Sequence, residues 1–285
     1  MIQARRFAAL LFQDKAALVS LFILMFWGLL ALASYMTDLG NIPTILSARL
    51  SPPSTDYLLG TDPHGQSVLR LLLAGARTSI IVSFYTVTLS VLIGIPIGAA
   101  AGYFGGRLDI FISRFIDILL AFPPLILPIA VMAFFGSGLF NVVLALSLTG
   151  WVGYARLVRG QFLSLREREY VTAARSLGAS DLRLMFKHIL PNTLSPLAVQ
   201  ATFALAGVII SEAGLSFLGL GVSQGHVSWG SMLNEARSYL IDAPYLAFFP
   251  AAALFSVVSA LNFIGEILRL SFDPKSLSQA GSPGS

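Results

Sequence analysis

Residues 78–104 read TSIIVSFYTVTLSVLIGIPIGAAAGYF, and this run contains no charged residue. A helix needs about 20 apolar residues to cross a bilayer, so the run predicts a membrane-spanning helix. Charged residues make up only 11% of the whole chain and hydrophobic types make up 56%. Soluble domains carry about 25% charged residues. We therefore predict an all-α integral membrane protein.

Similar apolar runs lie on both sides of this stretch and predict six transmembrane helices in all. Gly136-Ser137-Gly138 divides the uncharged stretch 118–155 into two of them. The prolines at positions 96, 123, 124 and 128 predict kinked helices. The expected spans are 16–36, a span within 78–104, a span near 112–135, and then 139–157, 193–211 and 243–265.

The N-terminal region has two interpretations. Basic residues precede the first apolar run, as they do in a signal peptide. The run has no charge over 16–36, however, and a signal-peptide core is only about 7–15 residues long. We favour an uncleaved signal anchor. The predicted division is a cytoplasmic N-terminus (1–15), a first helix (16–36), an outer loop (37–77), a core with five helices and the segment 164–191 (78–275), and a flexible tail (276–285).

The basic residues predict the orientation, because Lys and Arg concentrate in cytoplasmic loops. The chain has 18 of them, and four fall in outer segments, which leaves 14 on the cytoplasmic side. Those four are Arg49, Arg70, Arg77 and Arg237. Both termini are then expected in the cytoplasm.

The sequence lacks the residue patterns of ATP hydrolysis, metal binding and ion-coupled transport. There is no Cys and no Gly-rich loop followed by Lys and Ser or Thr, so any work driven by ATP requires a partner. His64, His188 and His226 fall on different sides of the membrane, and no metal site, catalytic residue or bound cofactor is predicted. The spans have no ionisable residue at mid-membrane depth, which counts against an ion-coupled secondary carrier. Sodium sites can use carbonyl groups, so this alternative stays open.

The cytoplasmic stretch 164–191 predicts two short helices joined at a glycine. Ser164 and Glu167 form a capping-box pattern at the start of the first helix, and Gly178 suits its end. Pro191-Asn192 is expected to end the second.

The second short helix would be capped by Ser180 or Asp181 and would carry one apolar stripe. The stripe consists of Leu182, Met185, Phe186 and Ile189. Such an element either docks on a protein partner and passes motion to the spans, or lies on lipid headgroups. The physics alone leaves both interpretations open.

A resemblance to a known family favours the first. The run from Glu169 to Gly178, continued to Leu190-Pro191-Asn192, resembles the EAA loop with which permeases of ATP-binding-cassette (ABC) importers contact their ATPase. More narrowly, the chain resembles the second permease of dipeptide, oligopeptide and nickel importers after about residue 55. The matching motifs are Leu59-Gly60-Thr61-Asp62, Ala101-Gly102-Tyr103, Ala121-Phe122-Pro123, Gly153-Tyr154-Ala155-Arg156, Leu215 to Gly221, Trp229-Gly230, Asn262 with Gly265 and Arg269, and Asp273-Pro274.

Two positions depart from the family pattern. Gln66-Ser67 stand where the family often has Arg-Asp, and Glu266 stands where it often has Asp. The first departure leaves the role of the outer loop open. Neither falls in the stretch 164–191.

The resemblance implies a type I ABC importer permease of the bacterial cytoplasmic (inner) membrane. Its substrate would be di- or oligopeptides or, alternatively, nickel or a metal chelate. The implied partners are a homologous permease, two ATPases that use ATP and magnesium, a soluble or lipid-anchored binding protein, and lipid, with no nucleic acid. The residues carried over as coupling residues are Glu169, Tyr170, Ala173, Ala174, Arg175, Gly178, Ala179, Leu190 and Pro191. A secondary carrier and a scaffold or channel are the distant alternatives.

Two further features have two interpretations each. Gly94, Gly98 and Gly102 recur every four residues and allow another helix to approach closely, either within this subunit, which we favour, or in the partner permease. Trp229, in the outer stretch 212–242, faces the binding protein or the pathway mouth by resemblance, or is an interfacial anchor.

Overall fold

The computed structural model describes residues 10–12, 14–34, 42–222 and 225–272. Regular structure in these residues is helical, apart from one isolated bridge between Thr61 and Ser67. The prediction of an all-α fold is confirmed. The predicted end of the first span at Met36 and the tail 276–285 lie outside the described residues.

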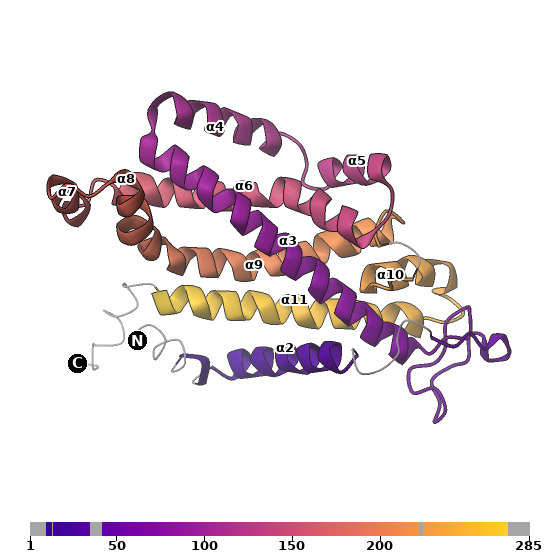
Figure 1. Ribbon diagram of the computed structural model, residues 1–285. Coiled ribbons are helices and arrows are strands. Elements are labelled where there is room, and N and C mark those ends of the chain that lie inside the picture. The colour runs from indigo at the N-terminus through magenta and orange to yellow at the C-terminus, as the bar shows by residue number, and fades with distance from the viewer. Residues whose placement is uncertain (1–9, 13, 35–41, 223–224, 273–285) are drawn as a thin grey trace.

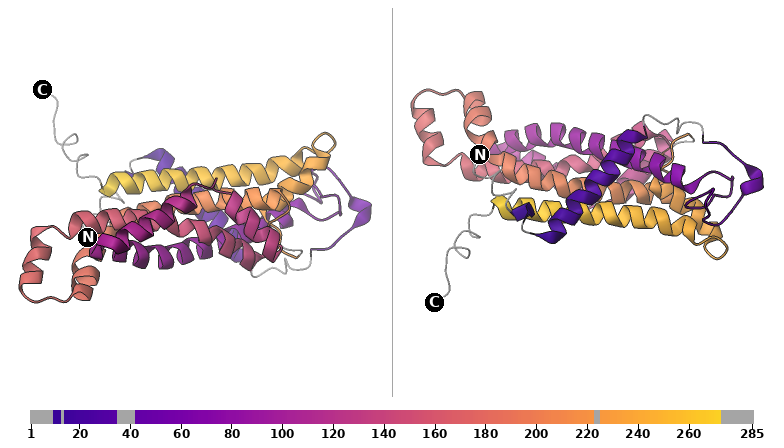
Figure 2. Two further views of the ribbon diagram at one scale, coloured as in Figure 1. Left: turned by 90° about the horizontal axis from the view of Figure 1, so that it is seen from above. Right: turned by 90° about the horizontal axis from the view of Figure 1, so that it is seen from below.

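Five helices of the described part are long and apolar enough to cross a membrane. Most of them run along the long axis of the molecule. α3 is oblique to its neighbours in Figure 1, and α2, in indigo, lies obliquely across the bundle in the right-hand view of Figure 2. The five helices are α2 (Lys15–Ala33), α3 (Val68–Phe104), α6 (Leu139–Leu165), α9 (Leu190–Phe217) and α11 (Tyr245–Phe272). The shorter helices are η1 (Leu46–Ala48), α4 (Gly106–Leu120), α5 (Ile126–Phe135), α7 (Glu169–Ser176), α8 (Asp181–Arg183), η2 (Leu184–Ile189), α10 (Trp229–Ala236) and η3 (Arg237–Tyr239).

The span expected near 112–135 is divided. α4 ends at Leu120 and α5 begins at Ile126, so the predicted kink is a complete break. Pro123 and Pro124 cause it, because neither has an N–H to donate and each disfavours helical backbone in the residue before it. A count of six spans therefore depends on treating α4 and α5 as one crossing.

Helix α3 starts ten residues before the predicted position at Thr78. Its 37 residues correspond to about 55 Å, more than the roughly 30 Å of a bilayer core. Part of the helix therefore extends beyond the lipid. Its most extensive contact is with α6.

The two ends of the helix bundle differ in what they carry. α7 and α8 lie at one end, whereas α10 and the loop 42–67 lie at the other (Figure 1). Many large apolar side chains between the ends are exposed, among them Phe134 at 88% and Phe255 at 75%. This pattern suits contact with lipid or with another membrane helix.

Candidate coupling site

The segment between α6 and α9 begins later than its sequence pattern predicts. α6 continues to Leu165, since its last turns bury Phe162, which is 1% exposed. Ser164 lies inside that helix, so the predicted capping box with Glu167 is wrong. α7 begins only after Arg168, whose backbone is extended.

Helix α7 ends at a glycine turn, at the predicted residue. The N–H of Gly178 donates to the Arg175 carbonyl at 3.0 Å, and the N–H of Ala179 donates to the Ala174 carbonyl at 3.1 Å. This is the Schellman arrangement. Gly178 has a φ of +83°, and a Cβ there would meet no atom within 4 Å. The need for glycine is therefore conformational rather than steric. The turn leaves Leu177 89% exposed.

The second half of the segment does not form a separate helix. α8 continues through the π-helical turn η2 into α9, so the predicted helix end at Pro191-Asn192 is wrong. Pro191 lies in the first turn of α9, where a missing N–H is tolerated.

The predicted apolar stripe is also wrong. Leu182 and Phe186 are 67% and 62% exposed, whereas Leu184, Met185 and Ile189 are buried. A π turn has more residues than an α turn, so it rotates the side chains away from the register that a period of 3.6 predicts.

Buried apolar residues fasten the segment to the bundle. Val171 of α7 and Leu184 of η2 are 0% exposed and belong to one cluster with Phe162. Ala174 and Ala179 are partly buried against the same cluster. Of the other predicted coupling residues, Leu190 is partly buried, and Glu169, Tyr170, Ala173, Arg175, Gly178 and Pro191 are exposed.

Polar contacts tie the segment to the end of α3. The Tyr103 hydroxyl donates to Oδ1 of Asp181 at 2.6 Å, and the Arg175 guanidinium lies 6.0 Å from the centre of the Tyr103 ring. Nη1 of Arg166 donates to the carbonyls of Gly102 and Tyr103 at 3.0 and 3.2 Å, which caps α3. Sequence reasoning did not predict that Arg166 and Asp181 contact the end of α3. Its one available signal was that Tyr103 falls in a family motif.

A further contact joins α7 to the start of α9. Nδ2 of Asn192 donates to the Tyr170 hydroxyl at 3.3 Å and to the His188 carbonyl at 2.8 Å. Side-chain contacts therefore link α7 to both α3 and α9.

The three glycines spaced four apart in α3 all face α6 of the same chain. A Cβ on Gly94 would lie 2.6 Å from the Trp151 carbonyl oxygen, and one on Gly98 would lie 2.3 Å from that of Ala155. A Cβ on Gly102 would lie 2.7 Å from the Arg159 carbonyl oxygen. These contacts are those of packing within the subunit.

At the opposite end, Trp229 lies in the protein interior rather than at a lipid interface. Its ring is 0% exposed, and Nε1 donates to the Leu72 carbonyl at 3.0 Å. A Cβ on Gly75 would approach the ring to 2.8 Å. The interpretation of Trp229 as an interfacial anchor is therefore wrong.

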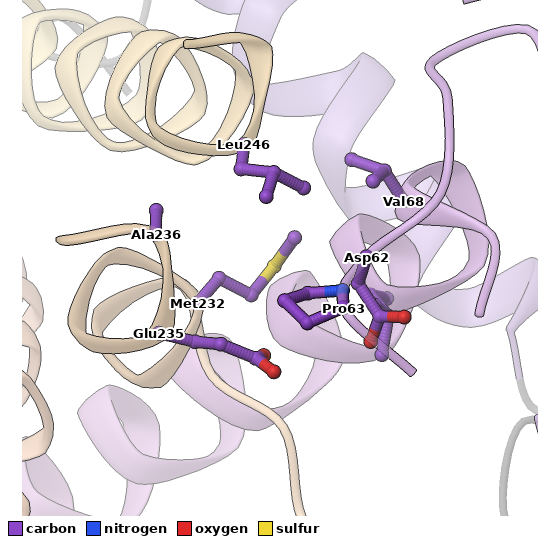
Figure 3. A pocket seen from close by; sticks show the side chains of 8 residues that line it. Asp62, Pro63, Val68, Met232, Glu235, Ala236 and Leu246 are labelled. Carbon is purple, nitrogen blue, oxygen red and sulfur yellow. The ribbon is translucent and has the colours of Figure 1, made fainter. Parts of the chain in front are cut away.

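Asp62 of the loop 42–67 and Glu235 of α10 line the same small cavity (Figure 3). Asp62 accepts from the N–H groups of His64 and Gln66 at 2.8 and 2.7 Å, and Nε2 of His64 lies 3.1 Å from Oε1 of Glu235. Burial raises the pKa of Asp62, and burial with the nearby Asp62 charge raises the pKa of Glu235. The adjoining cavity measures about 10 Å³, room for one water at most.

Metal-ligating side chains do not gather anywhere in the described ranges. No group of three or more His, Cys, Asp or Glu residues there could hold a metal ion. The segment between α6 and α9 is a hairpin that projects from one end of the bundle, is bonded to two long helices and presents exposed apolar side chains.

The five long apolar helices and the projecting hairpin agree with the membrane subunit of a transport system, the class to which the family match assigns this chain. The chain belongs to the family of binding-protein-dependent transport system inner membrane components, whose profile matches residues 94–277.

Relatives of known name match over most of the chain. The dipeptide transport system permease protein DppC of Alkalihalophilus pseudofirmus is 39% identical over 92% of this chain and 87% of its own length. The glutathione transport system permease protein GsiD of Pectobacterium atrosepticum is 40% identical over 92% and 88%. The oligopeptide transport system permease protein OppC of Bacillus subtilis is 39% identical over 92% and 86%.

Solved structures share the fold at lower identity. A chain of the MetNI methionine ABC transporter in an inward-facing conformation superposes with a TM-score of 0.60 and 21% identity, over 72% of this chain and 98% of that one. A chain of an amino acid ABC transporter gives 0.54 and 18%, over 71% and 92%.

Proposed function

We propose that this permease moves peptides into the cell across the bacterial cytoplasmic membrane, with both termini in the cytoplasm. It works beside a homologous permease and two ATPases, and a binding protein delivers the substrate. ATP and magnesium are used by the ATPases, and this chain does no covalent chemistry. Peptides are favoured over nickel or a metal chelate because the relatives described above are named as transporters of dipeptides, oligopeptides or glutathione.

The exposed apolar tip between α7 and η2 is the observation that carries the docking role. Leu177 is 89% exposed and Leu182 is 67% exposed, on an element that projects from one end of the bundle (Figure 1). Exposed leucines in water are costly, and contact with a partner would remove that cost. Glu169 and Ala173, which are also exposed, lie on α7, the helix that ends next to Leu177.

Motion from a docked ATPase would enter the spans through two connections. The first is the bond from Tyr103 to Asp181, with Arg166 on the carbonyls at the end of α3. The second is the continuous helical path from Asp181 into α9. Gly178 holds the turn between the two halves, so its substitution would alter how force is passed.

The docking role can be tested by placing a charge at the tip. Full burial of a leucine contributes about 1.5–3 kcal/mol, so Leu177→Glu should weaken ATPase binding by about tenfold or more. Leu58→Glu is the matched control, because Leu58 is 66% exposed at the opposite end. The assay is co-purification of the ATPases with the permease from membranes. Equal recovery with both variants would refute the docking surface.

The substrate is tested by uptake into proteoliposomes that contain the whole importer. A labelled dipeptide, glutathione and nickel with histidine are supplied with ATP inside and the binding protein outside. ATP-dependent uptake of a peptide is expected. Uptake of nickel with histidine, without uptake of the dipeptide or glutathione, would favour the metal-chelate alternative.

A further inference from the structure

A buried carboxyl group lies where three elements meet, at the end of the bundle that carries α10 (Figure 1). Glu212, in α9, is 0% exposed. Its Oε2 accepts a hydrogen bond from the Ser79 hydroxyl of α3 at 3.2 Å, and its Oε1 accepts one from the Ser216 hydroxyl of its own helix at 2.7 Å. Ser228, the residue before α10, also bonds to this carboxyl group through its side chain. Glu212 thus joins α3, α9 and the start of α10.

The first turn of α10 packs closely against the same two helices. A Cβ on Gly230 would lie 2.5 Å from the Cα and the carbonyl oxygen of Ala213, in α9. The ring of Trp229 is 0% exposed and donates its N–H to the backbone of α3. The Ser228 hydroxyl accepts from the N–H of Ser231 at 3.2 Å, which caps α10. The residue that caps α10 is therefore also the one that connects it to the buried carboxyl group.

A carboxyl group is a costly way to hold a helix in place. Burial of a polar group is unfavourable unless hydrogen bonds replace those that it made to water. Apolar side chains of similar volume can pack at least as stably as a buried polar network. Hydroxyl and carboxyl oxygens have a different advantage, because they can exchange a protein partner for water when two elements separate. The composition of this contact therefore suits one that forms and breaks.

The helices that hold α10 are also the two that the hairpin between α6 and α9 contacts at the opposite end. There, Tyr103 of α3 bonds to Asp181, and Asn192 of α9 bonds to Tyr170 of α7. Motion of the hairpin can thus shift α3 relative to α9. The bond from Ser79 to Glu212 already measures 3.2 Å, so a relative shift of about 1 Å would take it beyond hydrogen-bond range.

We propose that Glu212 is a positioning residue that latches α10 to α3 and α9, and that this latch releases when the outer end of the permease opens. The inference rests on the proposed function, because it assumes that ATP-driven motion enters through the hairpin. A shift of α3 relative to α9 breaks the bond from Ser79 to Glu212. Water then replaces the lost partner, and the first turn of α10 separates from the two helices.

The test uses cysteines as reporters of access, because the chain contains none of its own. Ala236→Cys reports the buried face of α10, and Ala17→Cys reports the opposite end of the bundle; the two alanines are 2% and 1% exposed. A charged thiol reagent is added to the purified importer without nucleotide, and modification of the permease is followed by mass spectrometry. With Glu212→Ala, labelling at position 236 should be about tenfold faster, the change expected for losing a hydrogen bond to a carboxyl group, while the rate at position 17 stays unchanged.

A conservative variant, a matched control and ATP separate a latch from a purely structural contact. Glu212→Gln keeps the volume and one acceptor oxygen, so its labelling rate at position 236 should lie between those of Glu212→Ala and the parent. Glu266→Ala removes the same side chain near the end of α11 and should leave that rate unchanged. In the importer that retains Glu212, trapping of the ATPases with ATP and vanadate should also speed labelling at position 236.

Three results would overturn the latch. One is an equal rate at position 236 with and without the Glu212 side chain. The second is equal acceleration at positions 236 and 17, since this is a loss of stability of the whole bundle. The third is a rate that does not rise when the ATPases of the Glu212-containing importer are trapped.

Two further points keep the outcomes distinct. If Glu212→Ala does not assemble, Ser79→Ala removes only the hydroxyl from α3, and an acceleration of about threefold at position 236 is expected. Failure of the unmodified importer to take up any peptide would instead remove the proposed function, whereas the ratio of labelling rates without nucleotide does not depend on the substrate.

Discussion

Replacement of Gly98 by alanine should loosen the α3–α6 interface. The new Cβ would lie 2.3 Å from the Ala155 carbonyl oxygen and 2.9 Å from the Ala155 Cα. Ordinary contacts between such atoms are about 3.5–4.0 Å, so the two helices must separate by roughly 1 Å. Because Gly94 and Gly102 lie on the same line of contact, the separation would affect the packing at both.

The magnitude follows from two opposing effects. Overpacking of a close interface costs about 1–3 kcal/mol, and alanine stabilises a helix over glycine by about 0.5–1 kcal/mol. The net expectation for Gly98→Ala is a loss of about 1–2 kcal/mol in the free energy of unfolding. Gly207→Ala is the matched control, because Gly207 lies within α9 and a Cβ there would meet no atom within 4 Å. That substitution should be neutral or stabilising.

The assay is unfolding of the purified permease by sodium dodecyl sulfate in mixed micelles, followed by circular dichroism. Both variants exchange glycine for alanine in a long helix, so they differ only in the contact that the new methyl group makes. Equal free energies of unfolding for Gly98→Ala and Gly207→Ala would refute the close approach of α3 and α6.

Three further changes test other parts of the molecule. Gly178→Ala places a side chain on a residue with positive φ, at a cost of about 1–2 kcal/mol. Substrate uptake should therefore fall while the permease still reaches the membrane. Normal uptake would contradict the coupling role. Glu212 is 0% exposed and accepts hydrogen bonds from the hydroxyls of Ser79 at 3.2 Å and Ser216 at 2.7 Å. Glu212→Leu should therefore destabilise the permease by about 1–3 kcal/mol, measured by thermal melting in detergent. A Glu212→Gln variant that is equally unstable would count against the contribution of these bonds. Burial raises the pKa of Asp62 above 3.8, so the folded loop binds this proton more tightly than the unfolded chain does. The stability of the loop should therefore fall as pH rises from about 4 through the raised pKa. The hydrogen-exchange protection factors of residues 61–67, which are corrected for the intrinsic pH dependence of exchange, should decrease over that window, and Asp62→Asn should remove this decrease.

Sequence reasoning predicted the features that depend on composition along the chain. Apolar runs placed the long helices, since a bilayer demands about 20 apolar residues wherever they occur. The glycine at 178 predicted the end of α7, because the left-handed conformation there suits only a few residue types. The family resemblance followed from the order and spacing of the motifs.

Sequence reasoning failed where neighbouring elements decide. The Ser164–Glu167 pattern is a valid capping box in isolation, but burial of Phe162 extends α6 through Ser164. The stripe around Met185 assumes a regular helix, and the π turn changes which residues face inward. Trp229 is typical of a lipid interface by type, yet its ring is buried against Leu72 and Gly75 of α3 and Trp27 of α2.

The sequence by itself determined that this chain is an all-helical membrane protein, where its apolar spans fall, and that it carries no nucleotide-binding loop of its own. These properties follow from local composition, because an apolar segment partitions into lipid as a helix whatever the rest of the chain contains. Only the tertiary structure decided that the glycines of α3 face α6, that Arg166 and Asp181 join the segment after α6 to α3, and that Ser79 bonds to Glu212. These pairs are distant in sequence, so they depend on how whole helices pack against one another, and no local pattern encodes that.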